Sequence, residues 1–577
     1  MHQFRVWAPQ RRRVDAVVDG RRLEMRPAEG GWWEVDDAGA GAGSRYGFSL
    51  DGGEVRPDPR SPSQPDGVLG LSEVVDHDAY AWQDGAWRGS TLTGSILYEL
   101  HVGTFSPEGT FAGAIARLPH LVRLGVDTVE LMPVAEFSGD RGWGYDGADL
   151  YAPHHAYGGP DGLKRFVDAC HASDLAVVLD VVYNHLGPVG NFLADFGPYF
   201  SETHHTPWGA AVNFDGPGSD EVRRFVVDNA LMWLRDYHFD GLRLDAVHAI
   251  IDESEVHILE QLAFEVARLS AETHHRTFVV AESDANDPRL VRSPERGGYG
   301  LDASWADDWH HALHTVLTGE HIGYYEDFGS FAQLAKALRQ AWVYDGEWSP
   351  RRRRVRGRKP FGVPAHAFVV AAQNHDQVGN RAAGERLCHI VEGGCAKAAA
   401  ALLLTSPFTP LLFQGEEWAA GSPFQYFTDH RDPELGRRVA EGRRAEFASF
   451  GWSELVPDPQ DPATFARSKL RWEELDEASH QDMLGWYRSL VALRRRLPPP
   501  VDELGADIDV AVDEALRRLS FGRRGVRVCV NLGDRDWELE CEDGEELVMA
   551  SDSSAAIRDR MLCLARSHVV VLERSLV

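Results

Sequence analysis

The feature that most constrains this chain is a serial alternation of apolar, strand-like runs with amphipathic segments of helical length. The alternation begins near residue 95. The strand-like runs are residues 96–102, 128–133, 176–182, 241–247, 277–281, 301–305, 367–372 and 410–413. The clearest helical segments between them are residues 111–124, 163–173, 221–237 and 254–273. Eight strand–helix units in series predict an α/β fold, a parallel (β/α)8 TIM barrel with its helices outside.

A doubly wound parallel sheet is the alternative arrangement for such a pattern. A sheet of that kind is expected to carry a glycine-rich dinucleotide turn after its first strand, and this chain has none there. The barrel is therefore the favoured prediction.

The barrel pattern does not cover the two ends of the chain. Residues 1–90 hold short strand-like runs separated by Gly, Asp and Pro, which is typical of a β-sandwich of the carbohydrate-module type. The catalytic barrel is predicted over 91–497, with a short insertion at about 186–220. Helical character then breaks at Pro498-Pro499-Pro500, and 498–577 is predicted as a small C-terminal β domain. The basic run Arg351–Arg354 is predicted to be a solvated loop.

The charge balance limits the partners of the chain. Its 59 Lys and Arg face 89 Asp and Glu, which gives a net charge of −30. Nucleic acids and anionic membrane surfaces are therefore not expected as partners.

The most apolar run has seven residues, the N-terminus shows no signal-peptide pattern, and the six cysteines form no CxxC pair. These features predict a cytoplasmic protein with reduced thiols, and they leave its oligomeric state open.

Polar residues at the carboxyl ends of the predicted strands point to chemistry, because barrel enzymes collect their catalytic groups there. Asp245 ends the fourth strand, Glu282 follows the fifth, and Asp376 follows the seventh. We expect these three carboxylates to converge on one rim.

The fourth and fifth strands predict opposite behaviour for two of these acids. Side chains alternate along a strand, so Arg243 and Asp245 share one side, and the guanidinium should keep Asp245 ionised by lowering its pKa. Glu282 follows the apolar run Phe278-Val279-Val280-Ala281, where a less solvated carboxyl should have a raised pKa. An ionised and a protonated carboxyl side by side are the equipment of a retaining glycosidase.

Metal catalysis is the competing interpretation of such a cluster. His185, His248 and His375 lie near the same strand ends and are residue types that ligate zinc. They form no HxH or HExxH spacing, so we predict neither a metal nor a cofactor.

The strand-end segments resemble the conserved regions of the α-amylase family, glycoside hydrolase family 13. Four match in order over roughly residues 95–490, and Met132-Pro133-Val134 resembles a further segment. They are Asp180–His185, Gly241–His248, Ala281-Glu282 and Asn374-His375-Asp376. The resemblance implies that Asp245 is the nucleophile, that Glu282 is the general acid and base, and that Asp376 stabilises the transition state. It also implies sugar or nucleophile contacts for His185, Arg243 and His375, and a sugar platform at Tyr145.

Three other segments resemble the malto-oligosyltrehalose trehalohydrolase branch of that family. The first runs from Asp307 to Tyr325, and the second runs from Gly415 to His430. The third, Asp245–Ile250, extends strand four. This branch cleaves the α-1,4 bond next to a terminal trehalose, so the implied substrate is malto-oligosyltrehalose, an α-1,4-glucan derivative, and a product is trehalose. The segments imply a trehalose pocket made of Asp307, Asp308, His310, His311, His248, Gln377 and Asn380.

Two other functions stay open from the sequence alone. A 1,4-α-glucan branching enzyme would share the fold and the acids but would transfer the glucan to a sugar hydroxyl. A non-catalytic glucan-binding protein is the second alternative, and the intact acid triad argues against it. Trp208 is predicted either to stack on a glucan ring or to pack within its loop.

Overall fold

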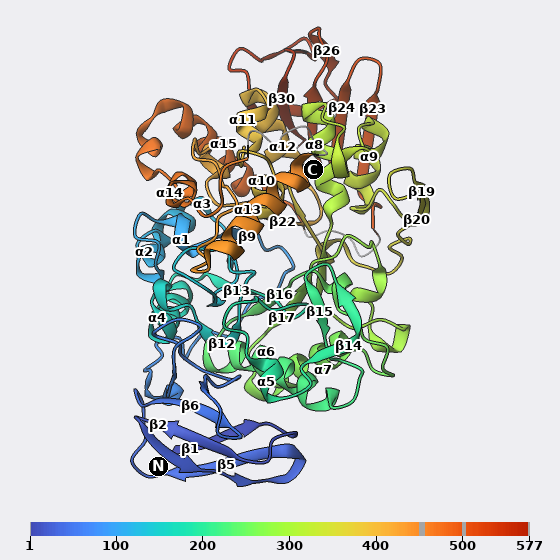
Figure 1. The fold of residues 1–577 in the computed structure, drawn as a ribbon. Coiled ribbons are helices and arrows are strands. Elements are labelled where there is room, and N and C mark those ends of the chain that lie inside the picture. The colour runs from blue at the N-terminus through green and yellow to red at the C-terminus, as the bar shows by residue number, and fades with distance from the viewer. Residues whose placement is uncertain (1, 449–455, 499–503, 575–577) are drawn as a thin grey trace.

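The computed structural model describes residues 2–448, 456–498 and 504–574. At its centre, eight parallel strands close into a barrel in chain order (Figure 1). They are β9 (Leu97–Leu100), β10 (Thr128–Leu131), β13 (Ala176–Val181), β16 (Gly241–Leu244), β17 (Phe278–Ala281), β18 (Ala303–Trp305), β21 (Phe368–Ala371) and β22 (Thr409–Phe413). Every residue of these strands is buried, as expected for parallel strands covered on both faces. The predicted barrel is therefore confirmed.

Helices cover the outside of the barrel. The longest ones include α4 (Gly159–His171), α6 (Ser219–Asp236), α7 (Ile258–Thr273), α8 (Asp307–Thr318), α9 (Phe331–Gln340), α12 (Gly393–Thr405) and α15 (Ala478–Arg496). The single helix predicted over 111–124 is wrong in one detail, because the chain forms α2 (Phe111–Ile115) and α3 (Leu118–Leu124). Pro119 explains the break, since proline fits the first turn of a helix but cannot continue one.

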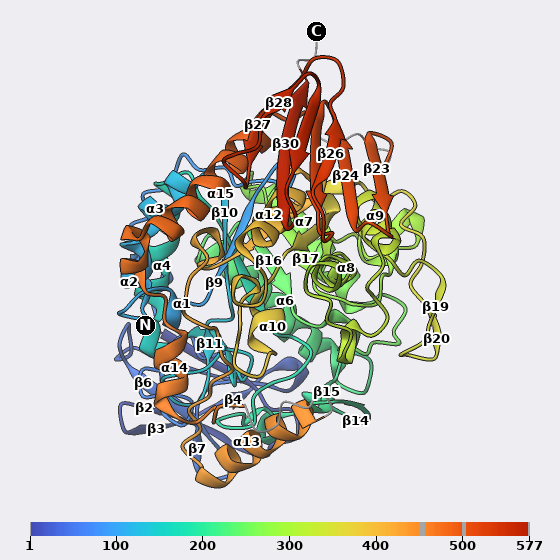
Figure 2. The same cartoon turned by 90° about the horizontal axis from the view of Figure 1, so that it is seen from above.

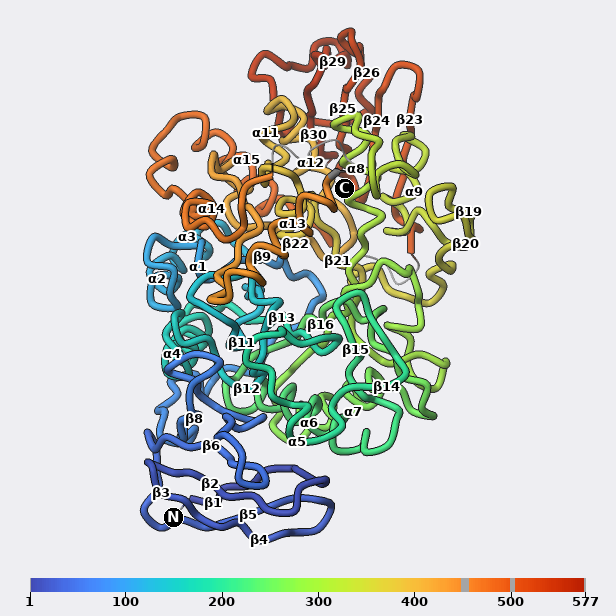
Figure 3. Tube along the Cα trace, in the orientation of Figure 1, coloured from blue at the N-terminus to red at the C-terminus, as the bar shows by residue number. Residues whose placement is uncertain are grey.

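The N-terminal strands form two sheets at one end of the molecule (Figures 1 and 3). One sheet has the order β1-β5-β4 and the other β3-β2-β6-β7, with β8 paired to β6. Their bounds are β1 (His2–Trp7), β2 (Val14–Val18), β3 (Arg21–Glu24), β4 (Arg26–Pro27), β5 (Trp32–Asp37), β6 (Arg45–Leu50), β7 (Val55–Arg56) and β8 (Ser72–Glu73). Phe4 of the first sheet meets Tyr46 of the second with ring centroids 4.9 Å apart, so the core lies between the sheets.

This sandwich rests on the segment that opens the insertion in the barrel. Phe48 packs edge-on against Phe196 of α5 (Leu193–Phe196), and Trp7 packs against Tyr199. The insertion continues as the hairpin β14 (Phe200–Thr206) and β15 (Gly209–Val212). The N-terminal domain therefore supports the base of a hairpin that reaches the catalytic side.

The linker between the sandwich and β9 is held by a buried network of imidazoles and carboxylates. The His171 ring contacts Asp84 of the linker at 2.9 Å and Asp240, just before β16, at 3.0 Å. Trp87 also donates to Asp240 at 2.7 Å. The two carboxylates outweigh burial and raise the pKa of His171 to about 9, so the imidazole is charged at neutral pH.

Two further sheets make up the C-terminal domain, with the orders β23-β24-β25-β30-β27 and β26-β29-β28. The strands are β23 (Ile508–Asp513), β24 (Arg518–Arg523), β25 (Val526–Asn531), β26 (Trp537–Glu540), β27 (Glu545–Ala550), β28 (Ile557–Arg558), β29 (Met561–Leu564) and β30 (His568–Arg574). Arg339 of α9 donates to the Val510 carbonyl at 2.7 Å, which ties this domain to the barrel (Figure 2). The helix α15 ends at Arg496, shortly before the predicted break, and Pro499 and Pro500 lie outside the described residues. Among the helices that the structure describes, none is long and apolar enough to cross a membrane.

Candidate active site

The three predicted carboxylates lie around one cavity of about 540 Å³ at the carboxyl ends of the strands. Asp245 directly follows β16, Glu282 directly follows β17, and Asp376 lies in α10 (His375–Gly379) after β21. Ala246 has φ 40° and ψ 50°, a left-handed conformation that costs an alanine about 1–2 kcal/mol. This turn ends the strand sharply and directs the Ala246 N–H toward Glu282.

One guanidinium connects the acids below the cavity. Arg243 is 0% exposed, and its Nη1 donates to both oxygens of Asp180, at 2.8 and 2.9 Å, and to Asp245 Oδ1 at 2.8 Å. Its Nη2 lies 3.7 Å from Glu282 Oε2. The predicted pairing of Arg243 with Asp245 is therefore present, and it holds one oxygen of this carboxylate in place.

Glu282 is largely removed from solvent, with its side chain 12% exposed. Burial raises its pKa well above the ordinary value, with a further increase from nearby Asp245 and opposition from Arg243. Glu282 Oε2 accepts from the Ala246 N–H at 2.5 Å, which leaves Oε1 to carry a proton. The raised pKa of Glu282 agrees with the expectation from its apolar strand, and Asp245 lies beside it on Arg243.

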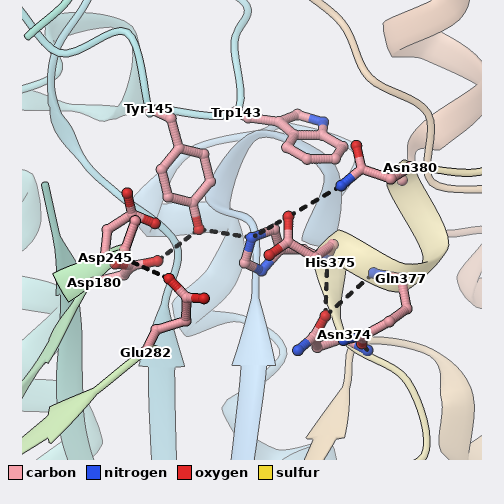
Figure 4. Close-up of polar contacts among 12 residues, drawn as sticks. Trp143, Tyr145, Asp180, Asp245, Glu282, Asn374, His375, Gln377 and Asn380 are labelled. Carbon is pink, nitrogen blue, oxygen red and sulfur yellow. Dashed lines mark hydrogen bonds and ion pairs between the residues drawn. The ribbon is translucent and has the colours of Figure 1, made fainter. Parts of the chain in front are cut away.

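Tyr145 and His375 close the floor of the site (Figure 4). The Tyr145 hydroxyl donates to Asp180 Oδ2 at 2.6 Å and lies 2.8 Å from His375 Nε2. The two rings lie nearly parallel, with centroids 5.2 Å apart. Tyr145 therefore lines the cavity with a ring whose position is fixed from below.

The second oxygen of Asp245 is held from β13. Asn184 Nδ2 donates to Asp245 Oδ2 at 3.1 Å, and the Asn184 side-chain oxygen contacts His185 Nδ1 at 2.7 Å. Trp208, in the turn between β14 and β15, stacks on His185 at 4.7 Å with an interplanar angle of 13°. Trp208 is 51% exposed and lines the cavity, so its outer face is open to a ligand.

Two of the predicted binding residues also line the cavity. His248 lies in the short helix that follows Asp245, and Asn380 donates to Asp376 Oδ1 at 3.3 Å. Gln377 differs from the prediction. Its side-chain oxygen accepts from the Asn374 N–H at 2.9 Å in a capping box at the start of α10, so the side chain serves the helix.

The four predicted residues of α8 separate into different environments. Asp308 is fully buried and accepts from the side chain of Asn286 and from two backbone N–H groups. His310 contacts the Ala372 carbonyl and the Tyr325 hydroxyl, each at 2.8 Å, and His311 packs among aromatic rings. Neither Asp308 nor His310 lines the cavity, and Asp308 Oδ2 and both His310 ring nitrogens are hydrogen-bonded within the protein, which gives the expected ligand contacts no support. Asp307 faces the catalytic acids, and its pKa rises to about 7 through burial and nearby Asp284 and Asp376.

The structure adds residues that sequence reasoning did not assign to the site. The cavity is also lined by Trp143, Asp146, Tyr426, Val439, Gly442, Arg443 and Glu446. The last four belong to α13 (Pro433–Ala448), which is held by a hydrogen bond of 2.7 Å from Arg443 to the Gly379 carbonyl. Trp143 and Asp146 flank Tyr145 in the sequence, which was a usable signal, whereas nothing local marks α13.

The basic run Arg351–Arg354 is partly different from its prediction. It makes the turn between β19 (Glu347–Ser349) and β20 (Arg354–Arg356), and Arg352 forms an ion pair with Asp284, two residues after Glu282. The segment is thus a hairpin that is anchored to the rim of the barrel by the ion pair between Arg352 and Asp284.

Two groups of side chains in the described ranges have the composition of a metal site. They are Glu136 with His154 and His155, and His204 with Asp215 and Glu253. Neither includes a catalytic carboxylate. Glu136 accepts from the His155 backbone N–H and from its ring, each at 2.8 Å, so this buried acid is satisfied within the protein.

Comparisons with known proteins agree with this geometry. Residues 63–197 match the family model of the alpha amylase catalytic domain. The malto-oligosyltrehalose trehalohydrolase of Arthrobacter ramosus is 53% identical over 92% of both chains, and that of Saccharolobus solfataricus is 45% identical over 85% of both. A crystal structure of a candidate alpha amylase from Salmonella typhimurium superposes with a TM-score of 0.91 at 39% identity, over 99% of this chain and 97% of that one. A 1,4-alpha-glucan branching enzyme from Thiobacillus denitrificans is 34% identical over 53% of this chain and 47% of its own length.

Proposed function

Because the chain belongs to the malto-oligosyltrehalose trehalohydrolase family, of the α-amylase type, we propose that it hydrolyses the α-1,4 bond next to the terminal trehalose of malto-oligosyltrehalose. The products are trehalose and a malto-oligosaccharide. The observation that carries this proposal is the pairing of Asp245, held by Arg243, with a buried Glu282 whose pKa is raised.

The reaction proceeds in two displacements. Asp245 attacks the anomeric carbon, and a carbon–oxygen bond to the carboxylate forms while the bond to the trehalose oxygen breaks. Glu282 gives its proton to that leaving oxygen. Water then attacks the same carbon, Glu282 takes up one of its protons, and the ester to Asp245 breaks. Two inversions give overall retention of the α configuration.

Other residues of the site support this sequence of steps. Asp376 is 43% exposed on the rim and is placed to bind sugar hydroxyls next to the positive charge that develops in the transition state. Asn184 and Arg243 each hold one oxygen of Asp245, which limits the motion of the nucleophile. Tyr145 and Trp208 offer ring faces to the apolar sides of glucose units. Asp307, His248 and Asn380 are the predicted residues that we retain for substrate binding.

We place the reaction in the cytoplasm as part of the same proposal. All six cysteines are free in the structure, and four of them are buried. Thiols that stay reduced are the usual state of cysteines in that compartment.

The proposal is tested by incubating the protein separately with maltopentaosyltrehalose and with plain amylose. Free trehalose from the first substrate is the expected result. New α-1,6 branches in amylose would instead support the branching-enzyme alternative. Binding of both glucans without turnover would support a binding protein.

A further inference from the structure

We propose that Glu99 is a positioning residue for the reaction, which holds His375 as an imidazolium beneath Tyr145 and beside Asp376. This inference rests on the proposed function for its readout. Glu99 lies on β9, on the inner side of the barrel and below the cavity, and it is 1% exposed. It is remote in sequence from the strand-end motifs that marked the site.

The contact between the two residues is double. Glu99 Oε1 lies 2.5 Å from His375 Nδ1, and Glu99 Oε2 accepts from the His375 backbone N–H at 3.0 Å. One carboxylate therefore fixes both the ring and the backbone at the start of α10. Since Asp376 is the next residue, the same carboxylate also anchors the peptide that carries this acid.

The neighbours of the ring assign its protons. The Tyr145 hydroxyl donates its single hydrogen to Asp180, so toward His375 Nε2 the tyrosine oxygen is an acceptor. On the other side, Glu99 is an acceptor toward Nδ1. This arrangement favours hydrogen on both ring nitrogens, and therefore a positively charged ring. The raised pKa of His375, about 9, agrees with this assignment, with Glu99 the largest cause after the opposing effect of burial.

Other ionisable groups face His375 from every side. They are His101 after β9, Glu130 on β10, Asp180 on β13, Arg243 on β16, and Tyr145 and Asp376. His101 is neutral, because burial lowers its pKa to about 3. Burial raises the pKa of Asp180 to about 7 against the opposing charge of Arg243, so Asp180 is ionised above that pH. Asp376 Oδ1 lies 3.5 Å from Nε2, so Glu99 is the carboxylate in closest contact with the ring.

Glu130 provides a matched control inside the same barrel. It is the register partner of Glu99 on the next strand and is also 1% exposed. Neither of its carboxyl oxygens has a hydrogen-bond partner among the described residues, and burial raises its pKa well above the ordinary value. Burial without a partner favours the neutral form of Glu130, so glutamine is its closest replacement in charge and shape.

A cationic His375 has a definite use in the proposed reaction. Its ring lies beneath Tyr145 and next to Asp376, where an imidazolium donates a hydrogen bond and offsets negative charge on the surrounding acids. A neutral ring would remove one positive charge from a floor that holds Asp180, Asp245 and Asp376. Glu99 thus acts on the sugar only through His375.

The experiment measures kcat/KM for maltopentaosyltrehalose from pH 5 to 10 in wild type, Glu99→Gln, Glu99→Asp and Glu130→Gln. Without Glu99, burial should lower the His375 pKa from about 9; at its ordinary 6.5 the charged fraction at pH 8 would fall about 30-fold, and a still lower pKa would deepen that fall. We therefore expect the alkaline limb of kcat/KM to move to lower pH in Glu99→Gln, so that its loss of activity relative to wild type grows from pH 5.5 to pH 8. Glu99→Asp should move the alkaline limb part of the way, and Glu130→Gln should leave this limb in place.

An equal loss of activity at every pH in Glu99→Gln would overturn the inference, because it would mean a structural role only. An unmoved limb in Glu99→Gln and Glu99→Asp would overturn it as well. If Glu99→Gln does not fold, Glu99→Asp carries the test alone.

A wild type that releases no trehalose would refute the proposed function, and the inference would then be tested by thermal unfolding. The folded pKa of His375 is raised, so the pair contributes stability that is complete below about pH 6.5 and is lost as pH rises through about 9. The difference in unfolding temperature between wild type and Glu99→Gln should shrink over that window. A difference that does not change with pH would overturn the inference.

Discussion

Replacing Arg243 with methionine tests whether one buried guanidinium organises the catalytic acids. The change removes hydrogen bonds to Asp180 and Asp245 and the nearby charge at Glu282, while the methionine still packs against Trp305, whose ring centre lies 4.4 Å from the guanidinium carbon. Removing one partner of a buried ion pair costs about 3–5 kcal/mol. We expect Arg243→Met to lose stability in this range.

Activity per folded molecule should fall in addition to stability. Buried carboxyl groups that lose their cation take up protons, and a protonated carboxyl is a poor nucleophile. Loss of one preorganised electrostatic partner costs about 10²–10³ in kcat, so we expect about this decrease per folded molecule. The assay is trehalose release from maltopentaosyltrehalose at saturation, corrected for the folded fraction from a thermal melt.

Arg386→Met is the matched control for this experiment. Arg386 is also 0% exposed, but its guanidinium donates to the carbonyls of Ser422 and Gln414 at 2.7 and 2.6 Å. Among the described residues it forms no hydrogen bond or ion pair with a catalytic acid. We expect it to lose stability while activity per folded molecule stays within about threefold, since its role is structural. If Arg243→Met kept more than a tenth of wild-type activity, or if both variants lost activity equally, the reasoning would be refuted.

The other predictions concern the two catalytic acids and the linker. Asp245→Asn should abolish trehalose release and leave the thermal midpoint within a few degrees of wild type; measurable turnover would contradict its role as nucleophile. Glu282→Gln should lower trehalose release from maltopentaosyltrehalose nearly as much. An aryl maltoside with a good leaving group should recover part of the rate. Equal losses on both substrates would argue against the role of Glu282 as an acid. His171→Phe should lower the free energy of unfolding by about 3 kcal/mol below pH 6.5. This magnitude follows from the shift of the His171 pKa from its ordinary 6.5 to about 9. That loss should vanish as pH rises through about 9 in chemical unfolding, and a constant loss would contradict the charged state of His171.

The barrel was predictable because its strands are short, apolar and β-branched, and because the helices between them carry a polar face. The three carboxylates were predictable for a related reason. A polar residue at the carboxyl end of a buried parallel strand has only the catalytic rim to face. Asp245 and Glu282 end such runs directly, so their position followed from the strand alone.

The predicted trehalose pocket was less accurate, because proximity in sequence to a strand end does not fix the direction of a helical side chain. α8 begins at Asp307, and its helical turn sends Asp308 and His310 toward the protein while Asp307 faces the acids. Contributions from α13 depend on how a distant helix packs over the rim, and no local pattern marks them. The glutamates at 99 and 130 were the overlooked signal, since an acid inside an apolar barrel strand needs either a partner or a proton.

The stereochemistry of the first turnover tests the central claim most directly. A proton NMR time course of maltopentaosyltrehalose hydrolysis separates the α and β anomers of the released maltopentaose before they equilibrate, and it detects trehalose in the same spectrum. Attack by Asp245 followed by water predicts that trehalose and the α anomer appear together. First appearance of the β anomer, or of glucose and maltose without trehalose, would contradict the account.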